Sequence, residues 1–228
     1  MLFRSVGGAY CTDFPLAKES RILCNFEGSF SDLQTVAHEL GHGYHGYVLK
    51  DDSAIHSGYP MTLAETASIF AQTLVFDAAL ADATEVEKIH VIEEFLQDST
   101  QVIVDILSRF YFERKLFSER SKAEVSAEEL CSFMIDAQKA TYGDALDEDY
   151  LHRYMWAVKP HYYSHELGFY NFPYSFGLLF GLGLFSRYKT EGEAFIPQYD
   201  KVLKATGRAS ANERSEEHTS ELQSLLII

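Results

Sequence analysis

Residues 38–42 are HELGH, so two histidines stand four positions apart and a glutamate directly follows the first of them. In an α-helix, side chains four positions apart project from the same face, one turn above the other. The apolar residues Leu33, Val36 and Leu40 recur around the motif at the spacing of a helix. The sequence therefore predicts a helix that presents two imidazoles side by side.

Two imidazoles in this arrangement can hold one Zn2+ ion through nitrogen atoms at about 2.0–2.1 Å. Glu39, next to the first ligand, can reach a water molecule on the metal and accept its proton. The plain alternative is a pair of helix-surface histidines in contact with each other. The apolar surroundings of His38 and His42 favour the zinc interpretation, with one zinc ion per chain.

A catalytic zinc ion needs a third protein ligand and one open position. A longer motif would place glycine at 45 and histidine at 48, but these positions hold His45 and Val48. Glu65 lies 27 residues after His38, in the apolar segment TLAETAS near the start of the next expected helix. A carboxylate on a buried face needs a cation or a metal, which makes Glu65 the candidate for the third ligand. The alternative is an ordinary glutamate in the first turn of a helix, favoured there by the helix dipole. For His45, packing is a better interpretation than metal binding.

The pattern along the chain is mainly helical. We expect residues 1–20 to form a loop and residues 21–27 to form one short strand. Ser31 and Asp32 supply the expected N-cap of the first helix. Helices are expected over about 31–49, 62–82, 84–118, 126–143, 147–156, 173–189 and 193–206.

The chain has 228 residues, of which 46% are hydrophobic, and a formal net charge of −15. That apolar content supports a core and excludes a disordered chain. Nucleic acids and anionic membrane surfaces repel so acidic a protein, so neither is an expected partner. The longest apolar run, residues 176–185, is shorter than the roughly 20 residues that cross a bilayer. Three cysteines make no disulfide framework, and no signal-peptide pattern is present, so a cytoplasmic protein is expected.

Five segments, taken in order, resemble one known family. They are GGAYCTDFP and KESRILCNFEGSFSD before the metal helix, HELGHGYH within it, GYPMTLAETASIF around Glu65, and FYNFPYSFGLLFGLGLF near the end. From about Gly7 to Arg208, the chain resembles the oligoendopeptidase F branch of the thimet oligopeptidase family of zinc metallopeptidases. The resemblance implies a mainly α fold: a zincin-like helical metallopeptidase catalytic region with a short edge strand before the HExxH helix.

The resemblance implies that His38, His42 and Glu65 are the zinc ligands and that Glu39 is the general base. It also implies a zinc metalloendopeptidase that hydrolyses internal bonds of short unfolded oligopeptides, with such peptides as its partners. Two alternatives stay open. One is a catalytically incomplete fragment that binds a metal or a peptide, and the other is a zinc carboxypeptidase.

The resemblance further implies that tyrosines near the C-terminal end of the cleft assist the reaction. Tyr170 and Tyr174 match that segment. A phenol there can donate a hydrogen bond to the oxyanion that develops on the scissile carbonyl; aromatic packing is the alternative. A family histidine precedes these tyrosines, and both His161 and His165 fit its position.

The loop between the two metal-binding helices borders the substrate cleft in this family. His56, Gly58 and Tyr59 lie in that loop and are candidate substrate contacts. A plain surface loop is the alternative.

Members of the family have much longer chains, so this sequence is expected to be a fragment. We expect residues 1–213 to form the catalytic region, truncated at both ends. Residues 214–228 begin with RSEEHTSELQS, which matches the translation of a common sequencing-library adapter. This tail is therefore expected to be an artefact rather than part of the fold; a short solvated helix is the alternative.

Overall fold

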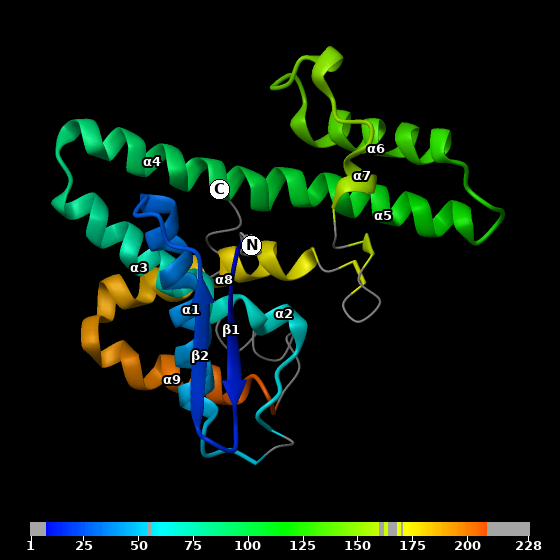
Figure 1. Ribbon diagram of the computed structural model, residues 1–228. Coiled ribbons are helices and arrows are strands. Elements are labelled where there is room, and N and C mark those ends of the chain that lie inside the picture. Colours follow the sequence, from blue (N-terminus) through cyan, green and yellow to red (C-terminus); the bar gives the residue numbers. More distant parts are fainter. Residues whose placement is uncertain (1–7, 54–55, 160–161, 164–167, 170, 209–228) are drawn as a thin grey trace, which may run out of the picture. The chain divides into compact units, whose positions relative to one another are not determined.

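The computed structural model describes residues 8–53, 56–159, 162–163, 168–169 and 171–208. Within them the protein is mainly helical, as expected, with one two-stranded antiparallel sheet (Figure 1). The strands are β1 (Ala9–Phe14) and β2 (Glu19–Cys24). The helices are α1 (Phe30–Leu49), α2 (Met61–Ala64), α3 (Thr66–Asp82), α4 (Glu85–Thr100), α5 (Ile106–Arg120), α6 (Ala127–Tyr142), α7 (Met155–Val158), α8 (Phe172–Glu191) and α9 (Ile196–Ala205).

The chain divides into two compact units. The first contains the residues up to Phe95 together with those from Phe176 onwards, and the second is Leu96–Ser175. The first unit therefore holds the hairpin, α1 to α3 and α9, and its core is built by α1, α3, α8 and α9. This core consists of Val48, Ala67, Phe70, Phe180, Leu184, Phe195, Tyr199, Val202 and Leu203.

The hairpin corrects the expectation for the start of the chain. Residues 1–20 were expected to form a loop, but β1 pairs with β2 from Ala9, opposite Cys24, to Phe14, opposite Glu19. Both strands pack against α1. The segment AYCTDF has too short an alternation to be recognised as a strand by itself. Its hydrogen-bonding partner and the helix beneath it supply the reason for its extended conformation.

The N-cap of α1 lies at least two residues earlier than expected. Ser29, not Ser31 or Asp32, is the N-cap, and its hydroxyl accepts a bond from the backbone N–H of Asp32 at 3.0 Å. The Asp32 carboxylate in turn accepts from the Ser29 N–H at 2.9 Å, which completes a capping box. Hydrogen bonds from the backbone N–H groups of Ser29 and Glu27 hold the pKa of the Asp32 carboxyl below its usual range. A strong cap fixes where the metal-motif helix starts.

Close packing of α1 on α3 depends on Gly41. A Cβ atom at this position would lie 2.4 Å from the carbonyl oxygen of Ala67 and 2.5 Å from the Cα of Ser68. Only glycine lets the two backbones approach so closely. The glycine in the middle of HELGH therefore brings α3, and the residues at its start, against the two histidines.

The segment Met61–Asp82, which contains α2 and α3, is long and apolar enough to cross a membrane by length and composition. The longest uninterrupted apolar run did not indicate this segment, because polar residues interrupt it. A buried core helix passes the same test, and Ala67 and Phe70 of α3 are buried in the core of the first unit. Packing inside the first unit thus accounts for the apolar residues at these two positions.

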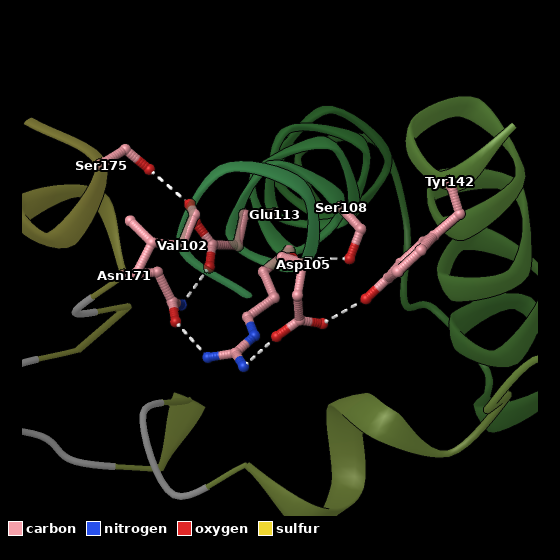
Figure 2. A network of polar contacts seen from close by, with 8 residues as sticks. Val102, Asp105, Ser108, Glu113, Tyr142, Asn171 and Ser175 are labelled. Atoms are coloured by element: carbon pink, nitrogen blue, oxygen red, sulfur yellow. Dashed lines mark hydrogen bonds and ion pairs between the residues drawn. The ribbon is translucent and has the colours of Figure 1, made fainter. Parts of the chain in front are cut away.

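In the second unit, a π-helical turn interrupts the helix that was expected over residues 84–118. Residues Gln101–Asp105 form this turn between α4 and α5. The carbonyl of Val102 accepts a hydrogen bond from the Ser175 hydroxyl at 2.8 Å (Figure 2). π turns are frequent at functional sites, and here Asp105, the last residue of the turn, belongs to a buried polar network.

Arg109 is the centre of this network and is only 2% exposed. It donates to the Asn171 amide oxygen at 3.0 Å and pairs with the Asp105 carboxylate. Asp105 also accepts a bond from the Tyr142 hydroxyl at 3.2 Å, and Asn171 donates to Glu113 at 2.7 Å (Figure 2). The network thereby connects α5, α6 and the residue that precedes α8.

Glu113 should make the stability of the protein depend on pH. Burial raises its pKa from 4.5 to about 7, against the opposing effects of Asn171 and Arg109. The folded state therefore holds the proton of Glu113 more tightly than the unfolded state does. The free energy of unfolding should fall by about 1–2 kcal/mol, after allowance for solvent screening, as the pH rises from 4.5 through about 7. Glu113→Gln removes the titration and keeps an acceptor for Asn171.

Urea unfolding at pH 4.5 and pH 8 measures this effect. The Glu113→Gln variant should lose less stability than the native protein between the two pH values, and Glu124→Gln, at an exposed position on the same chain, should not differ from native. An unchanged pH slope in Glu113→Gln would show that folding does not raise the pKa of this carboxyl.

Candidate metal centre

Three side chains from two parts of the sequence converge in the first unit. His38 and His42 project from α1, and Glu65 reaches them from the joint between α2 and α3. The Nε2 atoms of the two histidines lie 3.2 Å apart. Glu65 Oε2 lies 3.2 Å from Nε2 of His38 and 3.5 Å from Nε2 of His42.

These separations fit a tetrahedral zinc ion. Ligand atoms at about 2.0–2.1 Å from a tetrahedral centre stand about 3.3 Å from one another. The three measured separations bracket that value, and the donor set is two imidazole nitrogens and one carboxylate oxygen. Three protein ligands are typical of catalytic zinc sites, which keep one position open. The cluster therefore resembles a metal site.

The charges of the cluster suit a cation. Burial opposes ionisation of Glu65, but hydrogen bonds and the charges of His38 and His42 outweigh it and hold the pKa of Glu65 well below its usual range. Burial also lowers the pKa of His38, yet its contacts with Glu65 and Gln72 raise it overall. A carboxylate that stays ionised while buried requires positive charge beside it, which a metal ion or a protonated imidazole supplies.

The backbone at Glu65 explains how the carboxylate reaches α1. Glu65 caps α2 and precedes α3, with φ −89° and ψ 3°, so it lies between two helices rather than inside one. The Ser68 hydroxyl lies 3.0 Å from the Glu65 Oε2 atom and holds it. From the other side, α8 passes so close that a Cβ atom at Gly177 would stand 2.8 Å from the Glu65 Cβ.

Comparison with known proteins identifies the family. The sequence model of peptidase family M3 matches residues 6–223. The chain belongs to peptidase family M3. This family is zinc-dependent, in agreement with the donor set of the cluster.

Curated relatives of the M3 chain carry the name oligoendopeptidase F. This chain is 30% identical over 175 residues to the chromosomal oligoendopeptidase F of Lactococcus lactis subsp. cremoris, and the matched region covers 75% of this chain and 27% of the relative. It is 31% identical over 196 residues to an oligoendopeptidase F homolog of Borreliella burgdorferi, which covers 82% of this chain and 32% of the relative. The resemblance seen in the sequence is confirmed, and the chain spans about a third or less of these relatives.

Solved structures share the fold. A chain from Chlamydophila abortus described as a peptidase matches with a TM-score of 0.75 at 25% identity, over 93% of this chain and 36% of that one. PZ peptidase A, solved with an inhibitor, matches with a TM-score of 0.76 at 17% identity, over 93% of this chain and 38% of that one. The expected zincin-like helical fold is confirmed.

Glu39 of the M3 chain lies beside the cluster and is buried. Only 6% of its surface is exposed, and its Oε2 atom has no hydrogen-bond partner within the described part of the chain. An unsatisfied buried acceptor costs stability, and such groups in native proteins call for an explanation such as a catalytic role. The free oxygen is the feature expected of a group that accepts a proton from a reactant.

Gln72 is a contact that the sequence reasoning missed. Its Oε1 atom lies 2.8 Å from Nδ1 of His38, so Nδ1–H donates to the amide and Nε2 presents its lone pair to the cluster. Gln72 follows Glu65 by seven residues, which is two helical turns. That spacing, which places Gln72 two turns along α3 from the residue that precedes this helix, is the signal that could have found it.

Replacing Gln72 by leucine should weaken zinc binding by the M3 chain about tenfold. The leucine cannot accept from Nδ1 of His38, so neither the tautomer nor the ring orientation stays fixed. Gln72→Glu keeps an acceptor at the same place and should retain the affinity. Competition with a chromophoric chelator measures the dissociation constant. Equal affinities of the native protein and the leucine variant would exclude this role.

The candidate substrate loop is only partly exposed. His56 and Gly58 are exposed, and Nδ1 of His56 lies 3.1 Å from the Ser53 hydroxyl. Tyr59 is half-buried, and its ring stacks on His45 with centroids 4.0 Å apart. His45 itself is fully buried and is not part of the cluster, in line with the packing interpretation.

The remaining predicted residues belong to other parts of the chain. Tyr174 lies in the first turn of α8, in the second unit, so its relation to the cluster stays a prediction. Tyr170, His161 and His165 lie outside the described residues. Their roles also stay predictions.

Proposed function

We propose that this chain carries the zinc centre of a metalloendopeptidase that hydrolyses internal peptide bonds of short, unfolded oligopeptides. One observation carries the proposal: in a chain of family M3, His38, His42 and Glu65 stand at the separations of tetrahedral zinc ligands. Glu39, with its free buried oxygen, stands next to them. We propose one zinc ion per chain.

Each residue then has a definite task. A zinc ion held by His38, His42 and Glu65 would polarise the scissile carbonyl and acidify a water molecule. Glu39 accepts the proton of that water and passes it to the leaving amine. Burial of Glu39 keeps bulk water away from the carboxylate, so the proton stays with the reactants.

The supporting residues are proposed from the family resemblance. Tyr170 or Tyr174 donates a hydrogen bond to the oxyanion, and either His161 or His165 assists. His56 and Gly58 are exposed, as substrate contacts must be. Tyr59 is proposed as a further substrate contact through its hydroxyl.

The length of the chain favours one competing function. The chain spans about a third or less of its relatives, so a fragment that binds zinc or peptide without cleavage is the second candidate. Residues 1–213 are proposed as the part that carries the centre, in a cytoplasmic protein. A zinc carboxypeptidase, the other alternative, would release residues one by one from the C-terminus of a peptide instead of cutting internal bonds.

Zinc stoichiometry and peptide products test the proposal. The purified chain should bind about one zinc ion and cut an internally quenched peptide with blocked ends at interior bonds, as identified by mass spectrometry. Zinc and peptide binding without cleavage would select the incomplete fragment. Stepwise loss of residues from peptides with a free C-terminus would select a carboxypeptidase. A folded protein that binds no zinc would overturn the proposal.

A further inference from the structure

The three residues after α9 lie against the loop that joins the histidine helix to Glu65. A Cβ atom at Gly207 would stand 2.1 Å from the carbonyl oxygen of His56 and 2.8 Å from that of Gly58. The chain at Gly207 therefore touches the loop backbone directly. One residue on, the Arg208 guanidinium donates to the largely buried Asp52 carboxylate at 2.9 Å.

The first of the three residues, Thr206, contacts a fully buried histidine of α1. Nε2 of His45 lies 2.9 Å from the Thr206 hydroxyl, and the two residues are 0% and 2% exposed. The hydroxyl proton of Thr206 is already donated to the Leu203 carbonyl at 2.7 Å. Since the hydroxyl has one proton, Nε2–H of His45 must be the donor in this pair.

The same imidazole also holds the loop. The ring of His45 stacks on that of Tyr59, with an interplanar angle of 10°. Burial lowers the pKa of His45 to about 4, so the ring is neutral and needs no counter-ion. His45, which belongs to α1, therefore contacts both the end of the loop and the residue that follows α9.

We propose that Thr206–Arg208 is a clasp that holds the loop between α1 and α2 and thereby positions Glu65 against His38 and His42. The inference rests on the proposed zinc site. The loop is the covalent connection between the two ligand-bearing segments, and zinc ligands must be placed within about 0.2 Å. The contacts at Asp52, at the carbonyls of His56 and Gly58, and at Tyr59 restrain the loop at several points on both sides of its middle.

Zinc affinity, measured by chelator competition on the whole chain, tests the clasp. Gly207→Ala introduces the clash with the loop carbonyls, and Thr206→Val removes the acceptor for His45. Both variants should bind zinc about tenfold more weakly than the native chain. Two matched controls should stay within about twofold of native: Thr206→Ser, which keeps the hydroxyl, and Thr190→Val, which makes the same change as Thr206→Val at an exposed position.

A second readout separates positioning from loss of fold. Without zinc, a protease should cut the loop faster in Gly207→Ala and Thr206→Val, while circular dichroism shows native helix content. If Gly207→Ala does not fold, Thr206→Val and Arg208→Ala carry the test. Native affinity in the folded clasp variants would overturn the clasp and leave the zinc site intact. Absence of zinc from the native chain would instead overturn the proposed function, and the clasp with it.

Discussion

Replacing Glu39 by glutamine is expected to lower the rate of peptide cleavage about a thousandfold while zinc stays bound. Glutamine has nearly the same shape as glutamate but cannot accept the proton. Because Glu39 is not one of the three clustered donors, the zinc site itself should be unchanged. The turnover number on a quenched peptide and the zinc content of the same sample give the two readouts.

Glu124→Gln is the matched control, because it makes the same chemical change at an exposed position. It should cleave at the native rate. Cleavage by Glu39→Gln at the native rate would remove Glu39 from the mechanism. Loss of zinc together with activity would mean that Glu39 supports the metal rather than the proton transfer.

Replacing Glu65 by alanine is expected to bring the zinc content from about one ion per chain close to zero. Two imidazoles remain in that variant, which is one protein ligand fewer than the smallest set typical of zinc enzymes. The native protein should also gain thermal stability when zinc is added, since a ligand that binds only the folded state stabilises it. The variant should show no such gain.

Metal analysis after gel filtration and a thermal melt with and without zinc measure these effects. Glu124→Ala, at the exposed control position, should retain the zinc and the stabilisation. A full complement of zinc in Glu65→Ala would mean that another residue completes the ligand set. In that case the close approach of Glu65 to the histidines would be an ion pair.

Much of the fold could be predicted from local patterns. The expected helix over 126–143 is present as α6, with Ser126 and Glu129 forming a capping box, because a cap needs only residues within one turn. The N-cap of α1 was placed two residues late, since several neighbouring polar residues suit a cap. The strand β1 was missed because it depends on pairing with β2. The π turn at 101–105 was missed because no local signal distinguishes it from a regular helix.

The sequence by itself determined the two histidines and Glu39. Their spacing along one helix fixes which face they share, and helical geometry is a property of the local chain. Glu65 was a candidate from its spacing and apolar neighbours, and its assignment as a zinc ligand came from the family resemblance.

Only the tertiary structure decided the rest of the centre. The approach at Gly41 brings α3 against α1, and this places Glu65 at ligand distance and Gln72 behind His38. The contact of Thr206 with His45 joins residues 161 positions apart. Such contacts are invisible in a local pattern, because they are set by how distant segments pack around a shared core.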